Sequence, residues 1–367
     1  MTLKFILGKA SRDQRQAMID EVGQVLEADS ESQVYYIVPN HIKFQSELTV
    51  LNALRKKHNG NEATYAQNQL QVFSFSRLAW YFMKNEPIYQ VPRLSKAGIG
   101  MLIDRIILEH QDELTVFNGE QTQTGFIQQL ASQFDELQKG RITAEDFETL
   151  TQKVNADENS TIDLTAKMHD LAIIYTAFEE EMLGNYVDSN TLMEALCEYL
   201  AEQDLSHMVF LFDSFSSLTA QEMKLVKVLI QKSKAVIFSL TLDHAYTDSK
   251  PQEEDLFYES AKTYYQLYHF AHANAIKIKT DSFADQTRVS ADLVKLENFW
   301  LQASNMQDSQ PESLTDENSI QIRHADSRQT EIEQVARQIR QMVANDPQIH
   351  YHDFLVLARH LDTYETV

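Results

Sequence analysis

The sequence predicts an α/β protein in which a parallel sheet is interrupted by a long stretch of helices. Short apolar runs rich in Val, Ile, Phe and Tyr are each followed by a stretch with helical spacing, and this alternation is typical of parallel sheets. Residues 94–204 show helical spacing only. The chain has nine glycines and six prolines in 367 residues. Average usage of these two residues is roughly 12%, so helix breakers are scarce here.

Residues 1–92 are predicted to be the first part of the α/β domain. Each of three apolar runs precedes a helix, and helices are expected over residues 14–27, from Ile42 and from Ser76. Pro39 should end the second strand, because proline cannot donate a hydrogen bond to the ladder. The expected strands are LKFIL from Leu3, QVYYIV from Gln33 and LQVFSF from Leu70.

Residues 93–204 are predicted to be a helical insertion in that domain. Gly140 is expected just past the end of one helix, where glycine is common. Thr143 and Asp146 should cap the start of the next helix reciprocally. The apolar spacing of an amphipathic helix is seen in Ile99, Leu102, Ile103, Ile106 and Ile107.

The strand–helix alternation returns after the helical stretch. Residues 205–246 contain the runs MVFLF and KAVIFSLTL and are predicted to complete the first domain. Residues 247–318 are interpreted as a helical and irregular insertion with an acidic linker. Residues 319–367 are predicted to form a strand, a helix and a strand, the truncated start of a second α/β domain. The chain therefore resembles a piece of a longer protein.

The composition limits the classes of function. The formal net charge is −22, which opposes binding to the phosphate backbone of nucleic acids. Residues 1–93, however, hold 11 Lys and Arg against 9 Asp and Glu, so a local groove can still be positive. The single cysteine, Cys197, excludes an internal disulfide. Without a signal peptide or a run of 18 apolar residues, a cytoplasmic location and no membrane contact are expected.

The N-terminal stretch KFILGKASRDQRQAM resembles a phosphate-binding loop but lacks its functional residues. Such a loop has the pattern G-x-x-x-x-G-K-[ST], in which backbone N–H groups, a lysine and a hydroxyl bind phosphate and Mg²⁺. Counted from Gly8, the second glycine is replaced by Asp13, the lysine by Gln14 and the hydroxyl residue by Arg15. Asp13 would repel phosphate, so ATP hydrolysis is not expected at this position.

Six blocks of sequence, in this order along the whole chain, resemble the AddB/RexB family, and the RexB branch is the most similar. These proteins are the B subunits of bacterial ATP-dependent helicase–nucleases that process DNA double-strand ends. QVFSFSRLAW is the most specific stretch. The blocks are FILGKAS, YYIVPNHIKFQSEL, LQVFSFSRLAW, FLFDSFSSLTAQE, DLFYESAKTYY and SRQTEIEQVARQIRQMV with DFLVLARHLDTYETV.

The resemblance implies a fold, partners and cofactors. The fold would be a RecA-like domain, as in P-loop NTPases and UvrD-like superfamily 1 helicases, with a helical insertion, followed by the start of a second RecA-like domain. The family works as a heterodimer with an A subunit on single- and double-stranded DNA in double-strand break repair. The family also has a C-terminal nuclease domain, for which Mg²⁺ is expected. No catalytic residue and no cofactor are expected in the present segment.

The resemblance also assigns roles to individual residues. In helicases, an Asp and a Glu follow the strand that corresponds to FLFDSF in this chain. Here Asp213 remains, while Ser214 replaces the Glu. The degenerate nucleotide site would thus comprise the loop residues from Gly8 to Arg15 together with this pair. The positions that line the single-strand path and read the Chi recombination signal match Phe75, Arg77, Trp80, Phe215, His41 and Lys43.

The four central residues of this set suit such a path chemically. Aromatic faces stack on unpaired bases, and arginine pairs with phosphate or guanine. All four, Phe75, Arg77, Trp80 and Phe215, are therefore expected to be at least partly exposed. From composition alone, Phe75 and Trp80 would more often be core residues, and the resemblance is what reverses that interpretation.

Two other functions remain open at this point. A divergent but active P-loop ATPase or kinase would bind nucleotide. A purely structural scaffold for the A subunit would bind no single-stranded DNA. No metal site is expected: His269 and His272 lie three residues apart on a helix without a third ligand at suitable spacing, and HYHD at residues 350–353 is interpreted as a polar turn.

Overall fold

The computed structural model describes residues 1–29, 31–57, 68–118, 124–156, 161–304, 312–316 and 319–364. Contacts divide the chain into two compact units. The first comprises residues 1–289 and 297–309, and the second comprises residues 290–296 and 310–367.

The first unit is built on a seven-stranded sheet in which all ladders are parallel. Its order is β3-β2-β4-β5-β1-β6, and β7 also pairs with β1. Strands before and after the helical stretch thus join one sheet. The five longer strands confirm the predicted apolar runs. The strands are β1 (Thr2–Gly8), β2 (Gln33–Ile37), β3 (Leu70–Phe73), β4 (Met208–Phe212), β5 (Ala235–Thr241), β6 (Lys277–Ile278) and β7 (Ser282–Phe283).

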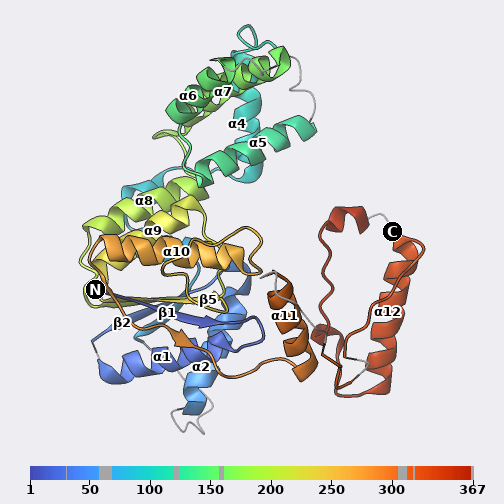
Figure 1. Cartoon of the computed structure of the whole chain (residues 1–367). Coiled ribbons are helices and arrows are strands. Elements are labelled where there is room, and N and C mark those ends of the chain that lie inside the picture. Colours follow the sequence, from blue (N-terminus) through green and yellow to red (C-terminus); the bar gives the residue numbers. More distant parts are fainter. Residues whose placement is uncertain are drawn as a thin grey trace. The chain divides into compact units, whose positions relative to one another are not determined.

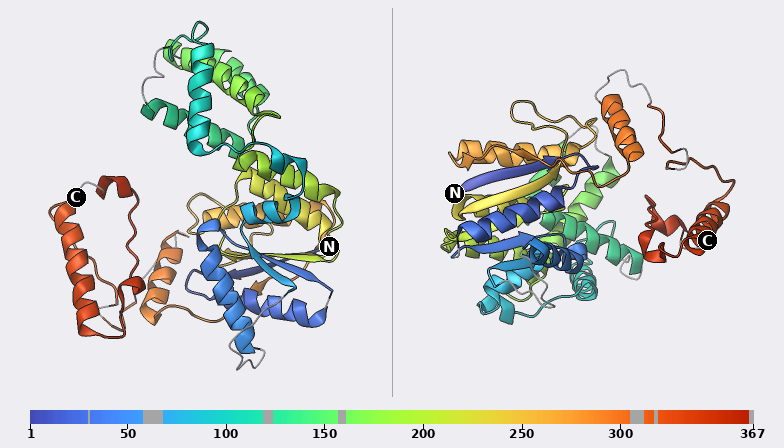
Figure 2. Two further views of the ribbon diagram at one scale, coloured as in Figure 1. Left: turned by 180° about the vertical axis from the view of Figure 1, so that it is seen from behind. Right: turned by 90° about the horizontal axis from the view of Figure 1, so that it is seen from below.

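Helices cover both faces of this sheet (Figure 1). α1 (Gln14–Ala28) and α2 (Lys43–Lys57) bury apolar side chains against one face. The other face packs against four helices, and the view from behind in Figure 2 likewise shows helices on both sides of the sheet. Because parallel strands are covered on both sides, they read as continuous apolar runs. The four helices are α3 (Phe75–Met83), α8 (Ser189–Glu202), α9 (Ala220–Lys232) and α10 (Tyr258–Ala273).

Four further helices form a separate apolar core of their own (Figure 1). At its centre, Phe134 packs against Tyr175 and Phe178 with ring centroids 5.0 and 5.3 Å apart. The predicted stripe of Leu102, Ile103, Ile106 and Ile107 is buried in this core. The helices are α4 (Lys96–Glu109), α5 (Thr124–Lys139), α6 (Ala144–Ala156) and α7 (Ile162–Met182).

The turn between α5 and α6 confirms one predicted cap and corrects another. Thr143 N donates to Asp146 Oδ2 at 3.1 Å and Asp146 N to Thr143 Oγ1 at 3.2 Å, a reciprocal cap. Gly140 was expected to take the left-handed position after α5, but Arg141 takes it, with φ of 57°. Gly140 N instead still donates to Glu136 O at 2.9 Å, so the helical hydrogen bonding extends one residue further than expected.

Asp170 on α7 anchors the loop that follows α4. Its fully buried carboxylate accepts hydrogen bonds from the backbone N–H groups of Thr115, Val116 and Phe117 at 2.7–3.0 Å. Burial by itself would raise the pKa of this carboxyl group, but these N–H donors together hold the pKa below its usual value. The charged form is therefore the one that ties the loop to the helix.

We expect Asp170→Asn to lower the free energy of unfolding at pH 7 by about 1–2 kcal/mol, because charge-assisted hydrogen bonds are replaced by neutral ones. A carboxyl group whose pKa is lower in the folded than in the unfolded protein stabilises the fold at pH values above the unfolded pKa. This stabilisation is lost as the pH falls through the native pKa. In urea titrations, the difference in the free energy of unfolding between wild type and variant should therefore become smaller below about pH 4. Asp163→Asn, a change of a 69% exposed side chain on the same helix, is the control; an equal effect there would contradict the role of Asp170.

The stretch after α10 differs from its predicted irregular form. Two residues of β6 and two of β7 pair with β1, and Thr287 forms an antiparallel bridge with Arg12. A strand of two residues is too short to show the alternation of apolar and polar residues by which a strand is recognised in a sequence. β6 and β7 form because the edge of β1 offers unpaired backbone groups. Residues 277–288 therefore lie along β1 and reach the loop that follows it.

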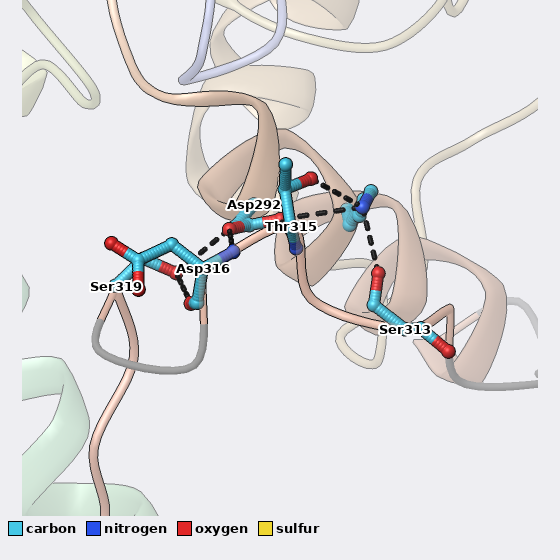
Figure 3. A network of polar contacts seen from close by, with 6 residues as sticks. Asp292, Ser313, Thr315, Asp316 and Ser319 are labelled. Carbon is cyan, nitrogen blue, oxygen red and sulfur yellow. Dashed lines mark hydrogen bonds and ion pairs between the residues drawn. The ribbon is translucent and has the colours of Figure 1, made fainter.

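In the second unit, Asp292 anchors Thr315, Asp316 and Ser319 (Figure 3). This buried carboxylate accepts hydrogen bonds from Thr315 N at 2.7 Å, Asp316 N at 3.0 Å and Ser319 Oγ at 2.8 Å. These donors lower the pKa of Asp292 well below its usual range. Lys295 adds an ion pair with Asp292 at 3.3 Å and donates to Ser313 O at 2.7 Å.

The two strands predicted in residues 319–367 are absent from the described part of this unit, so that prediction is wrong. The helix α12 (Arg328–Asn345) forms as expected, but none of its residues is buried. Residues 320–325 and 354–358 have no strand partner, and Leu357 is 82% exposed. A parallel strand requires neighbouring strands for its backbone groups and a covered face for its side chains. The second unit supplies neither within the described residues.

Among the described helices, none has both the length and the apolar character that crossing a membrane requires.

Candidate functional site

The predicted site residues follow the carboxyl ends of four strands of the sheet. The degenerate loop follows β1, His41 follows β2, Phe75 follows β3 and Asp213 follows β4. Because these strands are parallel, their carboxyl ends share one edge. Ligands of open α/β sheets bind in the crevice outside this edge, so the fold gathers the predicted residues where a site is expected.

In the degenerate loop, Asp13 is the N-cap of α1. Its carboxylate accepts a hydrogen bond from Gln16 N at 3.0 Å, and its own N–H donates to Gln286 O at 2.8 Å. The free N–H groups and partial positive charge of a helix N-terminus attract anions. Here the chain's own carboxylate satisfies this end of the helix, where a phosphate-binding loop would hold a nucleotide.

Gln14 closes the same loop from within. Its side-chain amide donates hydrogen bonds to Gly8 O and, at 3.4 Å, to Leu240 O. A Cβ added to Gly8 would lie 3.2 Å from the side chains of Ala284, Arg12 and Gln14. The close approach that glycine permits is therefore used for packing within the chain.

Asp213 is buried in a network of side chains. Tyr36 Oη donates to its Oδ2 at 2.8 Å, Ser239 Oγ to its Oδ1 at 3.0 Å, and Arg15 Nε lies 3.3 Å from Oδ2. Burial and the neighbouring carboxylate raise the pKa of Tyr36 well above its ordinary value, so the phenol remains a donor. Arg15 also donates to Ser214 Oγ at 3.0 Å. A carboxylate that would hold Mg²⁺ in a motor is thus neutralised by an arginine.

Residues that follow β7 cover the loop. Arg12 donates to Asp285 O at 2.7 Å, and Arg288 donates to Ala10 O at 2.8 Å. Helix α11 (Ala291–Ser304) contributes Glu297, whose Oε1 accepts from Ser11 N at 3.2 Å. The loop is therefore fastened by the segment that follows β7 and by α11.

Two of the predicted aromatic residues are part of the core, which corrects the expectation that they are accessible. Phe75 is 6% exposed and Phe215 is 9% exposed. Their ring centroids lie 5.4 Å apart, and Phe75 also lies 6.0 Å from Phe212. Burial against the sheet face is favoured over exposure, because each ring would otherwise leave a large apolar area in water.

Arg77 and Trp80 lie on the exposed face of α3, as predicted. The guanidinium of Arg77 lies 3.9 Å from the Trp80 ring centroid, and Lys84 Nζ lies 5.2 Å from it. Trp80 is 37% exposed. An indole flanked by two cations offers both a stacking surface and positive charge, the two features that single-strand binding sites combine. Lys84 was not among the predicted residues.

The turn after β2 carries His41 and Lys43, both accessible. Lys43 is paired with Glu47 at 3.4 Å on α2. Beside them, Phe44 is 74% exposed, and the sequence interpretation overlooked it. The signal was available: Phe44 precedes the buried positions Val50 and Leu54 but does not share their helical stripe, so an exposed ring could have been expected.

Only one group of side chains in the described part of the chain is arranged as a possible metal site. His350, His352 and Asp353 bring their ligand atoms within 4.8 Å of one another, and all three are exposed. Asp353 Oδ2 accepts a hydrogen bond from His350 N at 2.7 Å, which is the polar turn that the sequence indicated. His269 instead packs on Tyr265, with ring centroids 4.1 Å apart.

These features define an α/β protein with a parallel sheet, in which side chains of the chain itself fill the loop after β1. The chain belongs to the AddB family: the family model described as "ADDB, N-terminal" matches residues 5–297. This confirms the resemblance seen in the sequence.

Three relatives are each named as the B subunit of an ATP-dependent helicase/deoxyribonuclease. The protein of Levilactobacillus brevis is 48% identical over 368 residues, that of Lactiplantibacillus plantarum 43% over 378 residues and that of Pediococcus pentosaceus 37% over 369 residues. Each match covers 100% of this chain. The chain spans 30%, 30% and 31% of the respective relatives.

Proposed function

We propose that this chain is the part of a helicase–deoxyribonuclease B subunit that guides DNA and has no motor activity of its own. The whole protein would work as a heterodimer with an A subunit, which hydrolyses ATP, and would process double-stranded DNA ends for recombinational repair. This segment would need no cofactor. Its family and the names of its relatives support the subunit role.

One observation carries the non-motor role: side chains of the chain itself occupy the functional positions of the nucleotide loop. Asp13 caps α1, Gln14 bonds to Gly8 O, and Arg15 pairs with Asp213. A divergent active ATPase would need a cation for the phosphates and a carboxylate for Mg²⁺. Here the cation at the loop is already bound to the carboxylate, and both are unavailable.

Calorimetry with ATP and Mg²⁺ tests this role directly. We expect no saturable heat at millimolar nucleotide, because Asp13 repels phosphate and Arg15 remains paired with Asp213. A P-loop ATPase titrated in the same buffer serves as the positive control. Saturable binding that depends on Mg²⁺ would establish the divergent ATPase instead and would remove the proposal.

The DNA-guiding role is supported by the accessible residues at the carboxyl edge of the sheet. Arg77 and Trp80 on α3 lie together with Lys84, the C-cap of that helix, and the accessible residues His41 and Phe44 follow β2. We propose that these contact one unpaired strand and contribute to recognition of the Chi signal. The burial of Phe75 and Phe215 favours the scaffold function for those two residues only. They would stabilise the carboxyl edge of the sheet by packing and would not contact DNA.

A further inference from the structure

The stretch of sequence that spans α4 to α8 carries most of the negative charge of the chain. Residues 93–204 contain 7 Lys and Arg against 22 Asp and Glu, a net charge of −15 out of −22. Such a surface repels the phosphate backbone, because nucleic-acid binding depends on its neutralisation. It attracts cationic partners over a distance set by the ionic strength. This part of the chain is therefore suited to a basic protein surface.

A groove of about 870 Å³ opens in this stretch between α4 and α5 and ends at the start of α8. Small residues of both helices are among those that line it, and we call them its floor: Ala97 and Gly100 on α4 and Ala131 and Ser132 on α5. A Cβ added to Gly100 would meet only Ile127, at 3.5 Å. Small residues on both helices leave room for bulky aliphatic side chains from outside.

Acidic side chains stand around this apolar floor. Asp104 lies on α4, Asp135 on α5 and Asp188 at the start of α8, against a single base, Lys96. Asp135 already binds Lys139 and Asn190, and Asp188 caps α8. Asp104 forms no ion pair with any other described residue, so its charge is available to an incoming cation.

Met101 lies at the same groove and is 74% exposed. An unbranched, polarisable side chain adapts to different apolar surfaces, and methionine is frequent where proteins bind helices. Exposed apolar side chains in a concave, acidic surface are typical of grooves that receive an amphipathic helix.

We infer that this groove binds a basic amphipathic helix of a partner protein. Its aliphatic face would lie on Ala97, Gly100 and Ala131, and a Lys or Arg residue would face Asp104. α4 has 14 residues and is about 21 Å long, so a helix of similar length fits. A second copy of the chain is disfavoured, because it would bring the same net charge of −15 against this surface.

The test uses a labelled 14-residue peptide with leucines on one helical face and lysines on the other. Its binding to the whole chain is measured by fluorescence anisotropy, beside a peptide in which glutamates replace the lysines. We expect the lysine peptide to bind and the glutamate peptide not to bind. Gly100→Leu should weaken binding about tenfold or more by filling the floor, a loss of about 1.4 kcal/mol, whereas Gly100→Ala should bind as wild type.

Charge is tested separately, so that the result does not depend on the folding of one variant. Asp104→Lys should weaken the lysine peptide about tenfold, whereas Glu148→Lys, an equal change at an exposed position of α6, should have little effect. Thermal melts confirm that each variant is folded. Equal binding to wild type, Gly100→Leu and Asp104→Lys would overturn the inference, as would binding of the glutamate peptide or a dimer that Gly100→Leu dissociates.

Discussion

Replacing Phe75 by alanine should lower the free energy of unfolding by about 3–5 kcal/mol. The side chain is almost fully buried between the sheet and the helices that cover it, and it lies against Phe212 and Phe215. Truncation removes this packing and leaves a cavity that the surrounding strands cannot fill. Chemical unfolding followed by circular dichroism gives the loss, and Phe215→Ala should cause a loss of the same kind.

Phe44→Ala is the matched control for this loss. It removes the same side chain from an exposed position, so stability should change by no more than about 0.5 kcal/mol. DNA binding of the Phe75 variant, measured well below its melting temperature, should equal that of wild type. A stable Phe75 variant with reduced DNA binding would instead show that the ring leaves the core to contact the strand, and the assignment to the core would be wrong.

The burial of Phe75 on the core face of α3 could have been predicted from the sequence. Phe75, Leu78, Ala79 and Met83 follow the spacing i, i+3, i+4, i+8 and are all buried, which is the apolar stripe of an amphipathic helix. Arg77, Trp80 and Lys84 lie off this stripe. Local periodicity thus separates the core face of α3 from its exposed face. The resemblance to a family grouped both faces as one site because it carries no information on direction.

The five longer strands could be predicted because their signal is local. Each is a run of apolar residues covered on both faces, and two of them have a breaker at their end, Gly8 in β1 and Pro39 shortly after β2. The network of Arg15 and Asp213 could not be predicted, since it joins residues 198 positions apart. The sequence indicated only that phosphate would not bind. Which side chains replace it depends on the register of β1, β4 and β5.

The second unit shows the opposite case, where a correct local pattern gave the wrong structure. Residues 354–358 are apolar enough for a buried strand, but a strand is stable only with neighbours. Within the described residues none pairs with them, and the side chains after Phe354 are exposed. The apolar pattern indicates which side chains the segment could bury. It does not indicate whether a neighbouring strand is present to pair with the segment.

Replacing Trp80 by alanine should weaken binding of single-stranded DNA by about 1–3 kcal/mol, the usual contribution of one stacked base. The fold should lose little, because the indole is partly exposed and its described neighbours Arg77 and Lys84 are themselves on the surface. Arg77→Ala should weaken binding evenly across sequences if the guanidinium holds phosphate, or relax the preference at one base if it reads guanine. Anisotropy with labelled oligonucleotides gives both.

The chain offers a matched control, since its second and last tryptophan, Trp300, is 53% exposed on α11. Trp300→Ala removes an equal side chain from a position outside the predicted path and should leave DNA binding unchanged. Trp300→Phe makes Trp80 the single tryptophan, so stacking of a base on it should quench the protein's fluorescence as oligonucleotide is added. Salt titration then separates stacking from phosphate contacts, because only the latter release counterions.

The decisive comparison is made in the proposed heterodimer with an A subunit, by following Chi-dependent fragments of DNA. If Trp80 and Arg77 line the strand path, their variants should respond weakly to Chi while they melt at the wild-type temperature. Wild-type Chi response in folded variants of both residues, together with unquenched Trp80 fluorescence, would move recognition away from α3. The sheet and its aromatic core, to which Phe75 and Phe215 belong, would then be proposed as a scaffold for the partner subunit.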